Sequence, residues 1–363
     1  MHAPWKLVEE LLHLTADRKA PTIATGEWLI AMERSSPRPS FPAGGSTASR
    51  CIHAGCWRSD IAERSPPSTF HACARAAHDQ DRRVHGIGNH HPGLPSADAA
   101  GRLARAWHTA LTDGLGESSA ETNLQVAYYA HHLHAHGRQG TATDVDGLSP
   151  SELEILAALV AEIDTTTVRQ GRLTLPARQA VAWLAQRGGI PEKVMSAFIA
   201  VFCREVHTYL GRATSPERHA ARAEVADVIA RHRPRIVIAH SLGSVVAYEA
   251  LWSQPGLQID LLLTLGSPLG IPSAVFERLV PAPVRARGNR PPGVKQWINF
   301  ADPGDIVAIP RWLGTRFDGI ERDAESAIHL IDFHRVASYL RHPVTADALT
   351  PYLRSDGKPV TSL

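Results

Sequence analysis

A serine flanked by small residues stands where a strand pattern gives way to a helical pattern. The apolar run 235–239 leads into an Ala-His-Ser-Leu-Gly turn centred on Ser241, and a helical pattern, 244–252, follows. Small residues on either side of the serine permit a tight turn that lifts its hydroxyl clear of a sheet. The next backbone N–H, of Leu242, then points toward an oxyanion formed on attack. The pattern predicts a nucleophilic serine, although Ala239 replaces the first Gly of G-x-S-x-G.

A serine hydroxyl is a weak nucleophile until a base takes its proton, so this chemistry also needs a His and an acid. In sites of this kind the acid and then the His follow the serine along the chain. Asp302 and Asp305 lie in a turn-rich loop after the apolar run 294–300, and either can be the acid while the other caps the turn. His334 is the candidate base, because it follows the acid loop and stands between a strand pattern and a helical one.

A second oxyanion donor in such sites comes from a Gly-containing loop after an early strand. The segment from Val84 to His90 reads Val-His-Gly-Ile-Gly-Asn-His. Gly86 and Gly88 let the backbone approach a reacting group closely, and the N–H of Ile87 is the donor that we expect. The segment has neither the third Gly of a dinucleotide-binding loop nor the Lys of a P-loop, so phosphate binding is not expected there.

The elements that must position these residues alternate from Val84 onward between short apolar runs and helical segments. This alternation predicts an α/β fold, a mostly parallel sheet with flanking helices. The predicted strands are 84–87, 124–129, 235–239, 260–265 and 294–300, with 327–331 as a sixth. The helical patterns that flank them are 97–111, 217–231, 244–252 and about 334–340.

Between Tyr129 and Pro216 the strand-to-helix rhythm lapses. Helical patterns occupy this interval at 151–163, 177–186 and 194–210. We therefore expect a helical insertion over about 131–216 after the second core strand. An insertion at a strand's end is either a cap over a site or a supporting subdomain.

The two ends of the chain differ from this region. Residues 35–67 are rich in Ser, Pro, Arg and Gly, and no apolar period persists through the first 83 residues. Such a composition cannot bury enough apolar surface to order itself. We expect a low-complexity or disordered extension over 1–83, an α/β domain over 84–353 and a tail over 354–363.

Together these motifs resemble an α/β-hydrolase, and in particular the compact lipase-like or esterase-like serine hydrolases of actinobacteria. The resemblance covers roughly 84–353 and rests on the motifs above and on a Leu-Gly-Ser-Pro segment at 265–268. It implies a triad of Ser241, His334 and Asp305, because the Gly-Asp-Ile-Val spacing resembles the family's acid loop, with Asp302 as the alternative acid. The N–H groups of Leu242 and Ile87, beside Gly86, would form the oxyanion hole.

By this resemblance the protein would cleave a carboxylic ester, lipid-like esters included, through an acyl-enzyme and without a cofactor. An acyltransferase or a thioesterase on the same triad is the alternative enzyme, since only the acyl acceptor or the acyl bond differs. A binding protein with an α/β-hydrolase fold and no catalysis is the third possibility. The complete order of Ser, Asp and His favours catalysis over binding alone.

Composition limits the partners. Lys plus Arg number 38 against 36 Asp plus Glu, so a net charge of +2 gives no basic field for a nucleic acid.

No apolar run reaches the 18 or so residues that span a bilayer, so a membrane segment is not expected. Glu9 and Glu10 interrupt the first apolar stretch, so a secretory signal is not expected either. Four Cys cannot make a disulfide framework. We expect a cytoplasmic protein with a small-molecule partner, and nothing in the sequence sets its oligomeric state.

A histidine cluster follows the second predicted strand, at His131, His132, His134 and His136. Alternating His residues can bind a transition metal. No Asp, Glu or Cys accompanies them at a recognised spacing. We therefore expect a solvated loop rather than a metal site.

Overall fold

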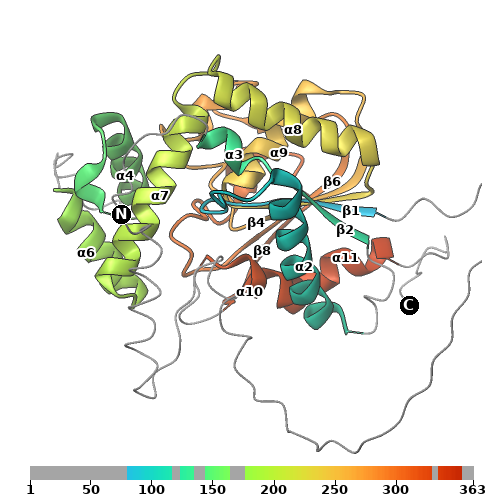
Figure 1. The fold of residues 1–363 in the computed structure, drawn as a ribbon, viewed down its shortest axis with the longest axis horizontal. Helices are drawn as coiled ribbons and strands as arrows, with labels where there is room; N and C mark the ends of the chain where they lie inside the picture. The colour runs from blue at the N-terminus through green and yellow to red at the C-terminus, as the bar shows by residue number, and fades with distance from the viewer. Residues whose placement is uncertain (1–79, 117–122, 135–143, 164–175, 329–333, 354–363) are drawn as a thin grey trace, which may run out of the picture. The chain divides into compact units, whose positions relative to one another are not determined.

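The computed structural model describes residues 80–116, 123–134, 144–163, 176–328 and 334–353. Their centre is a six-stranded sheet with the order β2-β1-β3-β4-β6-β8, in which each neighbouring pair is parallel. The predicted α/β class, a parallel sheet with flanking helices, is confirmed (Figure 1). The strands are β1 (Gln80–Val84), β2 (Asn123–Ala127), β3 (Ile236–His240), β4 (Ile259–Leu265), β6 (Val294–Ala301) and β8 (Arg322–Glu325). Two short strands, β5 (Gly288–Asn289) and β7 (Phe317–Asp318), pair separately.

Helices cover both faces of the sheet, and each face has its own apolar core (Figure 1). In β3, Val237 and Ala239 face one core while Ile236 and Ile238 face the other, the two-residue alternation of a strand. A parallel sheet buried on both sides has this near-continuous apolar sequence. The first core includes α8 (Pro216–His232) and α9 (Leu242–Ser253), and the second includes α2 (Ser96–Leu115), α10 (Val336–Arg341) and α11 (Pro343–Leu353).

Between β2 and α8 the chain adds a group of helices that pack mainly on one another. They are α3 (Ala130–Leu133), α4 (Pro150–Ile163), α6 (Ala177–Gly188) and α7 (Glu192–Leu210), with a 3-10 turn, η4 (Val145–Gly147). Figure 1 shows α4, α6 and α7 together at the left, beside the sheet rather than on a face of it. Their buried side chains continue the core that α8 and α9 form. No helix in the described ranges is long and apolar enough to cross a membrane.

Two strands lie at positions other than those predicted. The first is 80–84 rather than 84–87, so the boundary expected at residue 83 falls inside β1. The last is 322–325 rather than 327–331, of which 329–331 lie outside the described residues. Their sequences, Gln-Asp-Arg-Arg-Val and Arg-Asp-Ala-Glu, contain too few apolar residues for a search based on apolar runs. The expected extension over 1–83, apart from residues 80–83, and the tail over 354–363 also lie outside the described residues.

Candidate active site

Ser241 stands at the sharp turn between β3 and α9. Its backbone has φ 54° and ψ −135°, a conformation that costs energy for any residue with a side chain. Hydrogen bonds hold the turn: the Ser241 N–H donates to the Leu265 carbonyl at 3.0 Å, and the Ser244 hydroxyl donates to the Ser241 carbonyl at 2.6 Å. These bonds offset the strain and fix the Ser241 hydroxyl at the carboxyl edge of the sheet.

Three residues far apart in the sequence meet at this turn in one line of hydrogen bonds. His334 Nε2 lies 2.8 Å from Ser241 Oγ, and His334 Nδ1 lies 2.8 Å from Asp305 Oδ2. A carboxylate only accepts hydrogen bonds, so Nδ1 carries the proton and the lone pair of Nε2 faces the serine hydroxyl. The side chains are buried, with Ser241 0% and His334 8% exposed. The structure therefore brings together the three residues expected to form the triad.

The two candidate acids occupy different places. Asp305 faces His334 with Oδ2, while its Oδ1 accepts the Val307 N–H at 2.9 Å. Asp302 accepts the Gly304 N–H at 2.7 Å and the Ile328 N–H at 3.2 Å, so it connects its own turn to the segment that follows β8. Asp305 thus has the position expected of the orienting acid, and Asp302 has the position of the turn cap.

Tyr339 of α10 is a buried polar residue at this site that the sequence reasoning missed. Its hydroxyl donates to Asp305 Oδ2 at 2.7 Å and accepts the Asp302 N–H at 3.0 Å. Burial raises the pKa of Tyr339 well above its usual range, so the hydroxyl keeps its proton and remains a donor. The one feature of the sequence that could have indicated Tyr339 is its place in the helix that follows His334.

The loop after β1 passes against the turn at Ser241. A Cβ added to Gly86 would lie 2.6 Å from His240 Nδ1 and 2.7 Å from Ser241 Cβ, so only glycine permits this approach. Leu242 begins α9, and a helix's first N–H groups have no acceptor within the helix. The expected oxyanion residues Gly86, Ile87 and Leu242 therefore belong to segments that adjoin Ser241.

His85 anchors the start of that loop. The Tyr129 N–H donates to His85 Nε2 at 3.0 Å, so Nδ1 carries the proton and donates to the Gly86 carbonyl at 2.9 Å. The rings of His85 and Tyr129 stack with centroids 4.2 Å apart. Burial lowers the pKa of His85 to about 4. His85 is therefore neutral at physiological pH and has a structural place beside the site.

The helical insertion reaches the candidate base. The ring of Phe198, on α7, makes an edge contact with the His334 ring at a centroid distance of 5.4 Å. The His240 ring also lies near, with its centroid 4.7 Å from that of His334. Burial lowers the pKa of His240 well below its usual value, so this neighbour carries no charge. The candidate base is thus bordered by an apolar ring from the insertion and by a neutral imidazole from the residue before Ser241.

In the folded chain a carboxylate lies beside the histidine cluster, a neighbour that the sequence could not show. His131 and His132 of α3 lie near Glu224 of α8, with candidate ligand atoms within 4.8 Å of one another. The two imidazole centroids are only 3.8 Å apart. Imidazoles that share one tetrahedral zinc ion have centroids about 5 Å apart, so these rings would have to separate to bind one. The absence of a metal site stays a prediction, and His136 lies outside the described residues.

Comparisons with known proteins give no relative. No family model matches the chain, and neither a curated protein nor a solved structure matches it. Any inference about function therefore depends on the geometry of the site.

Proposed function

We propose that the protein is a serine hydrolase of the α/β-hydrolase type that cleaves carboxylic esters. The observation that carries this proposal is the line of two 2.8 Å hydrogen bonds from Ser241 Oγ through His334 to Asp305 Oδ2. A buried serine, histidine and carboxylate in this line have the geometry that activates a serine hydroxyl for attack on a carbonyl carbon.

The topology supports the same assignment. The Gly86 loop follows β1, Ser241 follows β3, Asp305 follows β6 and His334 follows β8. All of these strands are parallel, so their carboxyl ends meet at one edge of the sheet. The chain order of Ser, Asp and His is the order that α/β-hydrolases use.

In the proposed reaction, Ser241 Oγ forms a bond to the ester carbonyl carbon while its proton moves to His334 Nε2. Asp305 stabilises the imidazolium, and the N–H groups of Leu242 and Ile87 stabilise the oxyanion. The C–O bond to the alcohol then breaks, and the imidazolium protonates the leaving oxygen. Water attacks the acyl-enzyme with His334 again taking the proton, and the carboxylic acid leaves as the serine regains its hydrogen.

The insertion indicates the kind of substrate. Phe198 makes an edge contact with His334, and Ile87 is a partly buried apolar residue of the loop after β1. Apolar walls next to a reacting carbonyl favour an uncharged acyl or alkyl group over a charged one. We therefore propose that α7 serves as a cap and that esters with apolar groups are the substrates.

A fluorophosphonate probe tests the nucleophile directly, because it bonds to activated serines. The full chain, Ser241→Ala and the control Ser253→Ala would be labelled, and mass spectrometry would locate the adduct. Ser253 is an exposed serine at the end of α9 and lies outside the site. We expect labelling at Ser241 in the wild type and in the control, and none in Ser241→Ala. A folded wild-type protein without an adduct would overturn the proposal and favour a binding protein.

A further inference from the structure

Three consecutive carbonyl groups in the loop after β1 are held by side chains. The His85 carbonyl accepts a hydrogen bond from Tyr129 Oη at 2.9 Å. The side-chain amide of Asn89 donates to the carbonyls of Gly86 and Ile87, each at 2.9 Å. One amide thus binds two neighbouring peptide groups, and the orientation of both is fixed.

This orientation determines where the candidate donor points. The carbonyl and the N–H of a trans peptide point in opposite directions. Because the Gly86 carbonyl points toward Asn89, the Ile87 N–H of the same peptide group points away from Asn89. Gly86 is also the loop residue that lies against Ser241. His85 Nδ1 donates to the same Gly86 carbonyl at 2.9 Å, so Asn89 and His85 together set the direction of an N–H group close to Ser241.

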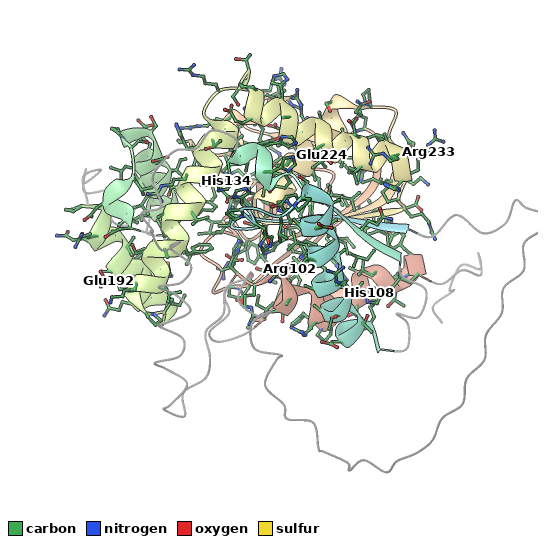
Figure 2. All side chains as sticks on the ribbon, viewed as in Figure 1. Arg102, His108, His134, Glu192, Glu224 and Arg233 are labelled. Carbon is green, nitrogen blue, oxygen red and sulfur yellow. The ribbon has the colours of Figure 1, made fainter. Side chains whose placement is uncertain are left out.

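The next N–H group along the loop, that of Gly88, donates a hydrogen bond to the helical insertion. The Gly88 N–H donates to Glu205 Oε1 at 3.0 Å, and Glu205 is a residue of α7 that is only 4% exposed. His134 Nε2 lies 3.7 Å from the same oxygen. Figure 2 places His134 close to α7, well away from Glu192 at the beginning of that helix. The Gly88 N–H is thus bound within the protein, whereas no residue that the structure describes accepts a hydrogen bond from the Ile87 N–H.

We propose that Asn89 and Glu205 are positioning residues that hold the Ile87 N–H in place as the oxyanion donor. The inference rests on the proposed function, since an oxyanion forms only if Ser241 attacks a carbonyl. Under it, α7 does more than cover the site, because Glu205 orients the loop that stabilises the transition state. Neither residue touches the reacting atoms in this arrangement.

Asn89→Asp tests the first residue, because aspartate has the same shape but an ionised carboxylate cannot donate to two carbonyls. With p-nitrophenyl butyrate as the probe ester, we expect kcat to fall by about 100-fold, the scale of one lost oxyanion donor, and KM to stay within about threefold. The affinity for an alkyl trifluoromethyl ketone, whose serine adduct carries an oxyanion, should fall in parallel. Asn89 is half-buried, so the substitution leaves the core intact.

Glu205 is tested by a pair of variants. Glu205→Gln keeps an acceptor for the Gly88 N–H, so its kcat should stay within about threefold of the wild type, whereas Glu205→Leu lacks an acceptor and should lose about tenfold or more. Glu152→Leu is the control, since it also removes a buried glutamate of the insertion, one that caps α4 by accepting the Ser149 N–H at 2.7 Å. Asn289→Asp, at an exposed asparagine of β5, is the control for Asn89→Asp.

The outcomes separate this inference from the proposed function. If the wild-type protein neither reacts with fluorophosphonate nor cleaves the ester, the proposed function itself is wrong. If the wild type is active and Asn89→Asp and Glu205→Leu keep its kcat and ketone affinity, the positioning roles are wrong. They are also wrong if Glu152→Leu loses as much kcat as Glu205→Leu at equal folded fraction, measured by circular dichroism.

Discussion

Tyr339 and His334 bind the same oxygen of Asp305, at 2.7 Å and 2.8 Å. The second carboxylate oxygen accepts the Val307 N–H. With donors on both oxygens, the carboxylate cannot rotate away from the imidazole without breaking hydrogen bonds in a buried setting. The orientation of the candidate base is thus fixed by α10 and by the acid loop together.

The two acids can be ranked by substitution. Asp305→Asn would present an amide to His334 and favour the wrong imidazole tautomer, so we expect kcat to fall by about 10³- to 10⁴-fold. Asp302→Asn keeps an oxygen for the Gly304 N–H and should cost less than about tenfold. Ester hydrolysis by both variants measures the difference, and the opposite ranking would make Asp302 the acid.

Tyr339→Phe keeps the aromatic packing of α10 and removes only the hydroxyl. It deletes a donor to Asp305 and leaves the buried Asp302 N–H without that acceptor. We expect the free energy of unfolding to fall by about 1–3 kcal/mol, the usual cost of an unsatisfied buried polar group. Urea denaturation measures this loss. An unchanged unfolding midpoint would show that the hydroxyl contributes nothing to the fold.

The buried ion pair of Arg218 and Glu249 joins α8 to α9, the helix that begins directly after Ser241. Arg218 Nε donates to Glu249 Oε2 at 2.9 Å, and the Tyr209 hydroxyl and the Val280 N–H donate to the same carboxylate. Arg218→Met leaves the carboxylate buried and unpaired, so we expect a loss of about 3–5 kcal/mol. Arg218→Met combined with Glu249→Leu should lose less than the sum of the single variants, and urea denaturation of all three tests this coupling.

Glu205 makes the stability depend on pH. Burial is the main cause that raises its pKa, from 4.5 to about 8, while the hydrogen bond from Gly88 opposes the shift. The folded state therefore holds a proton that the unfolded state has lost, and stability falls as the pH rises from about 4.5 to about 8. Glu205→Gln should remove this fall, which has a slope of up to about 1.4 kcal/mol per pH unit.

The difference in pH-dependent stability between the wild type and Glu205→Gln reports on Glu205 alone and not on its titratable neighbours. Burial lowers the pKa of His134, so this residue makes stability rise with pH in wild type and variant alike. Tyr129 is buried nearby, and its pKa lies well above its usual range, so it does not titrate in this interval. Urea unfolding of both proteins at several pH values gives the comparison, and parallel curves would contradict the raised pKa.

The sequence could indicate the candidate reacting groups of the site but not the residues that hold them in place. Ser241 and His334 follow from a local motif and from chain order, which a linear pattern preserves. The choice between Asp302 and Asp305 depended on a family resemblance, because both lie in one loop. The role of Glu205 could not be predicted, because its hydrogen-bond partner, Gly88, is 117 positions away in the sequence. The apolar periodicity of a helix does not show which group a buried carboxylate will contact.

The fold shows the same division. Strands β3 and β4 are buried on both faces, so their apolar runs identify them. Strands β1 and β8 owe their conformation to pairing with neighbouring strands rather than to apolar composition. A local sequence pattern does not show which strand a segment pairs with or in what register. Fold class was therefore predictable, whereas the positions of two strands were not.

One of the two edge strands of the sheet, β8, has a consequence for the loss of activity on heating. It is four residues long, it pairs only with β6 among the strands that the structure describes, and His334 follows it by nine positions in the sequence. Short edge strands fray at a lower free energy than the strands at the centre of a sheet. On heating, amide exchange along β8 should accelerate first and separate the base from Ser241 while the other strands remain paired. Activity would then be lost before the global melting temperature, and it would return on cooling.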